Sequence, residues 1–175
     1  MRKPRLPRTP EELNEWAARF FETIKGESDR GCVLIAAAFL DEALELLLRS
    51  RMATTAPVVK ASIDPLFTGI GPLKSFWAKT ELCRSLKLLA HWEHADLSRI
   101  RNLRNLFAHS YEKADFDDPR VVAIVSKLFG GLPKTKYRPK ANASPMKEAR
   151  QRFSLAAAWL AGTLHNRAGM AKHDD

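Results

Sequence analysis

The residues best suited to chemistry lie in one stretch near the middle of the chain, residues 99–111. This stretch holds Arg104, Asn105 and His109 at helical spacing, so that His109 lies one turn beyond Asn105 on the same side of a helix. A histidine placed in this way can act as a general base, while a nearby arginine stabilises the charge that develops on a phosphate group. The alternative for His109 is structural, because a histidine at the end of a helix also interacts favourably with the last carbonyls.

Arg104 also has a structural interpretation. At about 100° per residue it falls within the apolar stripe of Leu97, Ile100 and Phe107, and a buried arginine needs an acidic partner. Asp29 lies on the long helix that is expected to begin after Ser28, and it is aligned with the apolar positions of that helix. A buried pair of Arg104 with Asp29 would therefore satisfy both charges. The sequence leaves the catalytic and the structural interpretation open.

Signatures of other enzyme classes are not found in the sequence. Gly69 and Gly71 are followed by Pro72, without the third glycine and the preceding strand that phosphate-binding loops use, so they indicate a turn. His91 and His94 have a spacing that metal ligands can use, but they fall at a helix junction where exposed polar residues are common. We therefore expect no metal site and no cofactor.

Helical periodicity dominates the sequence and predicts an all-α fold. The prediction is a single-domain bundle of about six helices with a long central helix that begins after Ser28 and ends near Arg51. The other helices are expected at about 10–24, 76–90, 95–110, 119–128 and 145–167. Residues 53–75 contain several prolines and glycines, so they are expected to form a connection with one short turn at most.

Composition and charge define the domain plan. The chain has 175 residues, of which 45% are hydrophobic, and a net charge of +9, which is typical of one basic globular domain. We expect a basic arm at 1–9, one helical domain at 10–168 and a tail at 169–175. A basic mobile loop is expected within the domain, at 130–143, and the arm and this loop could attract nucleic acid. The loop carries Lys134, Lys136, Arg138 and Lys140.

The cysteines and the apolar runs indicate the compartment. Cys32 and Cys83 both fall in apolar helical patterns, which favours buried thiols in a reducing environment over a disulfide framework. No apolar run is long enough to span a bilayer, and the basic first residues are followed by polar ones rather than by an apolar signal segment. We expect a cytoplasmic protein with no membrane contact.

Four blocks of the sequence, in order, resemble the mannitol operon repressor family: residues 27–44, 67–79, 100–110 and 116–119. The first block reads ESDRGCVLIAAAFLDEAL and the third reads IRNLRNLFAHS. The resemblance implies an all-helical bacterial regulator without a recognisable helix-turn-helix. Asp29, Arg30 and Arg101 lie in these blocks and are expected binding residues, together with Tyr111 and the four basic residues of the loop.

Residues 104–111 also resemble the motif of the HEPN superfamily of small helical ribonucleases and toxins. That motif is an arginine, four residues and a histidine, often with a tyrosine two positions later, and here Arg104, His109 and Tyr111 match it. The resemblance implies that two protomers bring their motifs together and cleave RNA without metal, with the ribose hydroxyl as nucleophile. Arg104 and His109 would then be catalytic, and Asn105 would support them.

The favoured function is a transcriptional regulator of the mannitol-repressor type. It would act mainly through contacts with a regulatory protein partner, and we expect a homodimer. The alternative is a metal-independent endoribonuclease or toxin-like protein of the HEPN type. The enzyme is less favoured because its motif is short and many HEPN-like proteins are non-catalytic.

Overall fold

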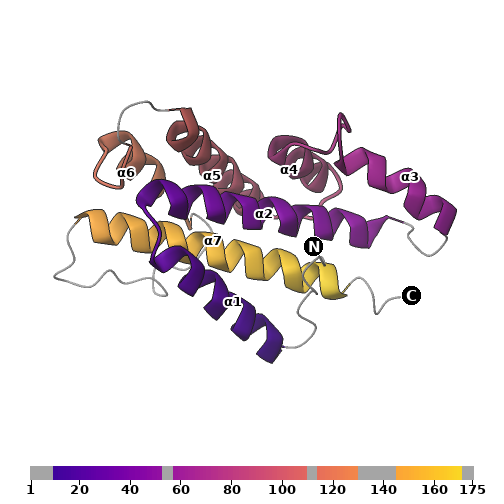
Figure 1. Cartoon of the computed structure of the whole chain (residues 1–175), viewed down its shortest axis with the longest axis horizontal. Helices are drawn as coiled ribbons and strands as arrows, with labels where there is room; N and C mark the ends of the chain where they lie inside the picture. Colours follow the sequence, from indigo (N-terminus) through magenta and orange to yellow (C-terminus); the bar gives the residue numbers. More distant parts are fainter. Residues whose placement is uncertain (1–9, 53–56, 110–113, 130–144, 171–175) are drawn as a thin grey trace.

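The computed structural model describes residues 10–52, 57–109, 114–129 and 145–170, and every regular element within them is an α-helix (Figure 1). In chain order the helices are α1 (Pro10–Lys25), α2 (Asp29–Arg51), α3 (Pro57–Phe67), α4 (Phe76–Ser85), α5 (His91–His109), α6 (Pro119–Val125) and α7 (Pro145–Met170). The predicted all-α class is confirmed. The described part of the chain has seven helices where about six were expected. The description as one domain around a central helix stays a prediction.

The two longest helices, α2 and α7, lie side by side, and the other helices pack around them (Figure 1). α1 packs against α7 and α2, whereas α4 and α5 pack against α2 and against each other. α6 contacts α5 and α7. The shared core includes Leu40 and Leu44 of α2, Ile100 of α5 and Phe153 of α7, all fully buried. Each such side chain contributes roughly 1.5–3 kcal/mol through its removal from water.

Several helix starts follow from side-chain caps that the sequence predicts. Ser28 precedes α2 and its hydroxyl accepts a hydrogen bond from the backbone N–H of Gly31, at 3.1 Å. Asp118 caps α6 by accepting from the N–H of Arg120, at 2.8 Å. Since the first N–H groups of a helix have no partner within it, these caps define where the helices begin.

Residues 53–75 differ from the expected connection, because the 11-residue helix α3 forms within them. Pro57 is its first residue, where no backbone N–H is needed, and Pro65 lies in its last turn, where only one hydrogen bond is lost. The chain then turns back at Gly69, whose φ is +58°, as the predicted turn requires. A Cβ at Gly71 would lie 2.1 Å from the carbonyl oxygen of Pro65, so only glycine fits against the end of α3.

The boundary between α4 and α5 also lies earlier than predicted. α4 ends at Ser85 because Lys87 adopts a left-handed conformation, with φ of 57°, and the N–H of Leu88 bonds to the carbonyl of Cys83. α5 begins at His91, where the side chain of Glu93 accepts a hydrogen bond from the N–H of Ala90, at 2.7 Å. Apolar periodicity alone does not predict where α4 ends or where α5 begins.

Both cysteines are buried, as predicted, and each is a free thiol. Burial raises the pKa of the Cys83 thiol to about 12, and it also raises the pKa of Cys32. These thiols are therefore protonated near neutral pH and poorly nucleophilic. Among the described helices, none has the length and apolar character that crossing a membrane requires.

Candidate functional site

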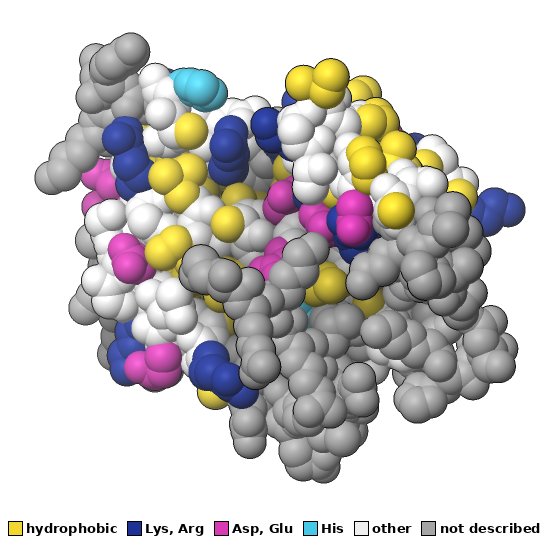
Figure 2. Space-filling model, turned by 45° about the vertical axis from the view of Figure 1, so that its right-hand side comes forward, with side chains coloured by type: hydrophobic (Ala, Val, Ile, Leu, Met, Phe, Trp, Pro, Cys, Tyr) yellow, Lys and Arg dark blue, Asp and Glu magenta, His cyan; other side chains and the backbone are white. Residues whose placement is uncertain are grey.

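A groove of about 550 Å³ lies between α2, the start of α4 and α5, and it is the candidate functional site. We call it the α2–α4–α5 groove. Its lining residues are Leu34, Ala37, Ala38 and Asp41 of α2, residues 74–77 (Lys74, Ser75, Phe76 and Trp77), and Arg101, Arg104 and Asn105 of α5. Figure 2 shows Lys and Arg side chains beside hydrophobic ones on the upper part of the molecule, the height at which α4 and α5 lie in Figure 1.

Three cationic side chains line this groove. Arg101 and Arg104 lie one helical turn apart on α5, and Lys74 lies just before α4. Within the described part of the chain, the side chains of Lys74 and Arg101 form no hydrogen bond or ion pair. Among the described residues, Arg104 donates only to the side-chain oxygen of Asn105, at 3.2 Å. Three cations that have no acidic partner in the described part of the chain make the groove attractive to an anion.

The acidic residue of the groove, Asp41, is paired with a lysine through one of its two carboxylate oxygens, while the other, Oδ1, is buried and has no hydrogen-bond partner among the described residues. The ammonium of Lys79, a residue only 2% exposed, lies 2.9 Å from Asp41 Oδ2 and 3.3 Å from Glu45 Oε2. Glu45 also accepts from Arg49, at 2.9 Å. Since α2 supplies both carboxylates and α4 supplies the lysine, this cluster holds the start of α4 against α2. It thereby fixes one wall of the groove and leaves the unpaired positive charge on the rim.

The aromatic residue Trp77 adds an apolar surface to this rim. Its side chain is 53% exposed, although it belongs to a large residue type that is usually well covered. Ser75 positions it by capping α4, since its hydroxyl accepts from the N–H of Ala78, at 3.1 Å. Neither Lys74 nor Trp77 has a spacing or pattern that marks it in the sequence, although both fall in the family-like block at 67–79.

The buried pair of Arg104 with Asp29, one of the two interpretations that the sequence left open, is wrong. Asp29 instead lies 2.5 Å from Nη1 of Arg150 on α7 and accepts from the N–H of Phe116, at 3.1 Å. Arg104 is exposed, although its helical angle places it next to Leu97 and Ile100. The physical reason is that the neighbouring helices leave a groove at this level of α5, so this part of the stripe faces solvent rather than a packed helix.

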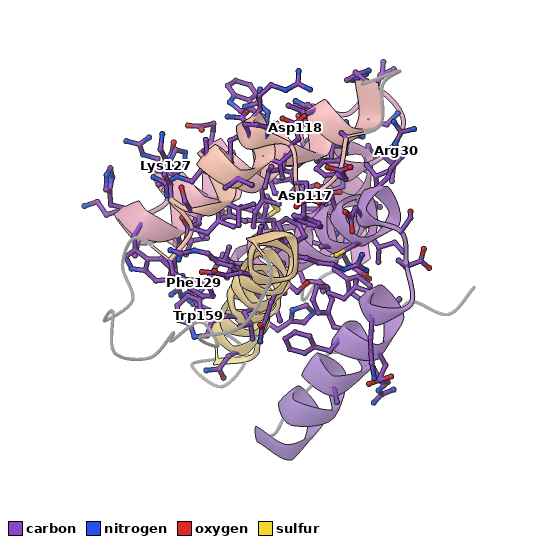
Figure 3. All side chains as sticks on the ribbon, turned by 90° about the vertical axis from the view of Figure 1, so that its left-hand side faces the viewer. Arg30, Asp117, Asp118, Lys127, Phe129 and Trp159 are labelled. Atoms are coloured by element: carbon purple, nitrogen blue, oxygen red, sulfur yellow. The ribbon has the colours of Figure 1, made fainter. Side chains whose placement is uncertain are left out.

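The structure separates the other predicted site residues. Arg101, Arg104 and Asn105 line one groove, whereas His109 is exposed at the end of α5 and is not among the groove residues. Arg30 is exposed on the first turn of α2 and points outward (Figure 3). Tyr111, Lys134, Lys136, Arg138 and Lys140 lie outside the described residues, as do the arm at 1–9, the loop at 130–143 and residues 171–175.

The two histidines considered as metal ligands have other surroundings. Nε2 of His94 lies 2.8 Å from Glu81 Oε1, which links α5 to α4, and His91 is exposed. In the described ranges, no three His, Cys, Asp or Glu side chains come together in a way that could hold a metal ion. His94 therefore has a structural partner in the packing of α4 on α5.

Comparison with known proteins places this architecture in a family. The model of the mannitol repressor family, MtlR, matches residues 18–154. The mannitol operon repressor of Escherichia coli K12 is 25% identical over 121 residues, which are 69% of this chain and 62% of that protein. The chain thus matches less than two thirds of the length of its curated relative.

Two solved structures share the fold. The X-ray structure of the MtlR-HPr complex from Escherichia coli superposes with a TM-score of 0.71 at 22% identity, over 86% of this chain and 99% of that one. A "possible transcriptional regulator YggD" from Shigella flexneri gives a TM-score of 0.68 at 17% identity, over 85% and 96% of the two chains. At these identities the likeness concerns the fold, and the family assignment rests on the match to residues 18–154. The chain belongs to the mannitol repressor family.

Proposed function

We propose that this chain regulates transcription as a mannitol-repressor-type protein and that it acts through contacts with other proteins. The single observation that carries the proposal is the family match over residues 18–154, which includes the α2–α4–α5 groove. The groove supports a role in protein contacts, because exposed tryptophan and arginine side chains are enriched where proteins bind one another. Trp77, Arg101 and Arg104 provide such a combination.

A first partner comes from the fold relative that was solved as an MtlR-HPr complex. We extend this contact to the present chain and propose that it binds the HPr protein of its own source. The test is isothermal titration calorimetry of the full chain with purified HPr. We expect saturable binding, and the absence of heat at protein concentrations on the order of 100 μM would contradict the proposal.

A homodimer in the cytoplasm is the proposed working state, and nucleic acid is a proposed further partner of the basic arm and loop. Sedimentation of the full chain tests the dimer, and a monomer at all concentrations would exclude it.

Electrophoretic binding to the chain's own promoter region over a salt series tests direct contact with DNA. We expect weak binding that is lost as salt rises, whereas sequence-specific binding at physiological salt would show that no protein partner is needed.

A second candidate function is the HEPN-type ribonuclease, and the exposure of its motif residues supports it. Arg104 and His109 are both exposed on α5, so neither side chain is buried in the core and both are accessible to RNA. The test is incubation of the full chain with structured and single-stranded RNA in EDTA, with His109→Ala as the matched variant. Cleavage that His109→Ala abolishes would establish the enzyme, and intact RNA across substrates would exclude it.

A further inference from the structure

We propose that the α2–α4–α5 groove binds an acidic, partly apolar segment of a partner protein, with a carboxylate held by Arg101 and Arg104 and an apolar side chain packed on Trp77. This inference rests on the proposed function, because it names the kind of surface through which the regulator recognises a partner. It concerns the chemistry of the groove and does not depend on HPr being that partner. The volume of about 550 Å³ is within the range of pockets that hold a few side chains or a small ligand.

Charge complementarity is the first argument. The guanidinium groups of Arg101 and Arg104 come from positions three apart on α5, so they lie on neighbouring turns and can approach one carboxylate together. Lys74 extends the positive rim from the side of α4. Arginine binds carboxylates in a bidentate manner, and such charge-assisted hydrogen bonds are stronger than neutral ones. The groove therefore selects for Asp or Glu.

The apolar lining is the second argument. Ala37 and Ala38 of α2 are small, and with Leu34 they form a surface that another chain can approach closely. Trp77 stands beside this surface with 53% of its side chain exposed. An apolar side chain of the partner that covered Trp77 and the alanines would bury surface on both molecules and would strengthen the nearby ion pairs by excluding water.

A protein segment fits these observations better than a nucleic acid does. Nucleic acids are bound by cations that follow the phosphates along a track, whereas here two arginines are concentrated on one stretch of α5 beside an apolar surface. The nearby corner between α3 and α4 exposes Ile70 completely, four residues before Lys74. An exposed isoleucine adds apolar contact area for a protein partner and contributes nothing to the binding of phosphates.

The groove is also preorganised for binding. Lys79 pairs with Asp41 and Glu45 across α2 and α4, so the start of α4, which carries Trp77, is held by partly buried ion pairs rather than by the ligand. Arg101 and Arg104 form no ion pair within the described residues, and the one carboxylate that lines the groove with them, Asp41, is held by Lys79. Binding therefore does not have to break an internal ion pair, and preorganised sites bind more tightly for the same contacts.

The test uses the full chain and a phage-displayed library of random peptides about twelve residues long. We expect the enriched peptides to combine Asp or Glu with Leu, Ile, Phe or Trp. The affinity of one enriched peptide, measured by fluorescence polarisation, should fall about tenfold or more for Arg101→Glu combined with Arg104→Glu, and also for Trp77→Ala. The matched control is Lys25→Glu combined with Lys127→Glu, which makes the same change in charge at exposed residues outside the groove and should leave the affinity unchanged.

The outcomes separate this inference from its alternatives. Enrichment of basic peptides, no enrichment, or equal binding by the groove variants would overturn it. An oligo-dT probe that binds more tightly than the peptide and depends on the same arginines would assign the groove to nucleic acid.

Circular dichroism melts of every variant identify any variant that fails to fold. If the charge-reversal variant fails to fold, Arg104→Gln replaces it in the binding measurement. HPr titration of the same variants is measured separately, so loss of peptide binding with HPr binding intact, or the reverse, shows which proposal fails.

Discussion

Two groups of arginines in this protein have opposite surroundings. Arg150 and Arg167 of α7 are paired within the molecule: Arg150 contacts Asp29 and also donates to the carbonyls of Ile24 and Glu27, at 3.0 and 2.6 Å. Arg101 and Arg104 line a groove without an acidic partner in the described structure. An arginine on a helix of this protein therefore contributes to folding when a carboxylate and carbonyls converge on it. Where they do not, the arginine is available to an external ligand.

The pair of Arg167 with Glu93 is the clearest member of the paired group. Glu93 is 1% exposed, and its two oxygens accept from Nη1 and Nη2 of Arg167, at 2.9 and 3.0 Å. The pair joins the end of α7 to the start of α5, where Arg167 also donates to the carbonyl of Leu88. The geometry is bidentate, which suits a nearly buried carboxylate.

The largest expected effect follows from breaking this pair. Arg167→Met leaves the buried carboxylate of Glu93 without its cation, so the free energy of unfolding should fall by about 3–5 kcal/mol. Urea denaturation measures the loss. Arg167→Met combined with Glu93→Leu should recover a large part of it, because both charges are then gone. A loss below about 1 kcal/mol for the single variant would contradict the paired assignment.

A smaller effect is expected at the start of α2. Asp29→Ala removes the partner of Arg150 and the acceptor of the Phe116 N–H, and should cost about 2 kcal/mol. A double-mutant cycle should give a coupling of about 1 kcal/mol between Asp29 and Arg150, and none between Asp29 and Arg104. Strong coupling with Arg104 would restore the pair that the sequence suggested and would remove the groove arginine from the unpaired group.

Histidine ionisation gives a further test of the paired region. Burial lowers the pKa of His165 on α7 below its ordinary 6.5, against the hydrogen bond to the Ala161 carbonyl, which raises it. His165 thus binds a proton more readily in the unfolded chain than in the folded one. Its contribution to the free energy of unfolding is therefore fully present above pH 6.5 and decreases as the pH falls below that value. Thermal melts between pH 7.5 and 5 should show this decline, and His165→Gln should flatten it. An equal slope in the variant would assign the decline to other groups.

The smallest effect on stability is expected in the groove itself. Arg101→Ala and Arg104→Ala remove no ion pair that the described residues form, so each should change the free energy of unfolding by no more than about 0.5 kcal/mol. Urea denaturation of these two variants together with Arg167→Met compares the free energies of unfolding of both arginine groups in one experiment. Destabilisation of the groove variants by more than about 2 kcal/mol would place these arginines with the paired group.

The starts of the helices were the most predictable part of the fold. Ser28 and Asp118 cap α2 and α6 as their residue types suggest, and the proline at 145 begins α7. Such signals are local and can be read from a few residues. α3 was missed because Pro57 and Pro65 suggest a loop, whereas both lie at positions in a helix where a missing N–H costs little.

The candidate site was predictable only in part. Arg101, Arg104 and Asn105 could be selected from their types and spacing, but the partner assigned to Arg104 was wrong because pairing depends on which helices pack together. Helical angle alone placed Arg104 in the core, and the open groove beside it is a tertiary feature. Lys74 and Trp77 gave no comparable signal, since their roles arise from the packing of α4 against α2 and α5.

The division between recognition and folding arginines is tested most directly by measuring stability and binding on one protein, the double variant Arg101→Ala with Arg104→Ala. We expect its melting temperature to stay near that of the wild type, while its affinity for a selected acidic peptide falls about tenfold or more. A variant that binds the peptide as the wild type does, or that melts as early as Arg167→Met, would contradict the claim that the groove arginines serve recognition rather than folding.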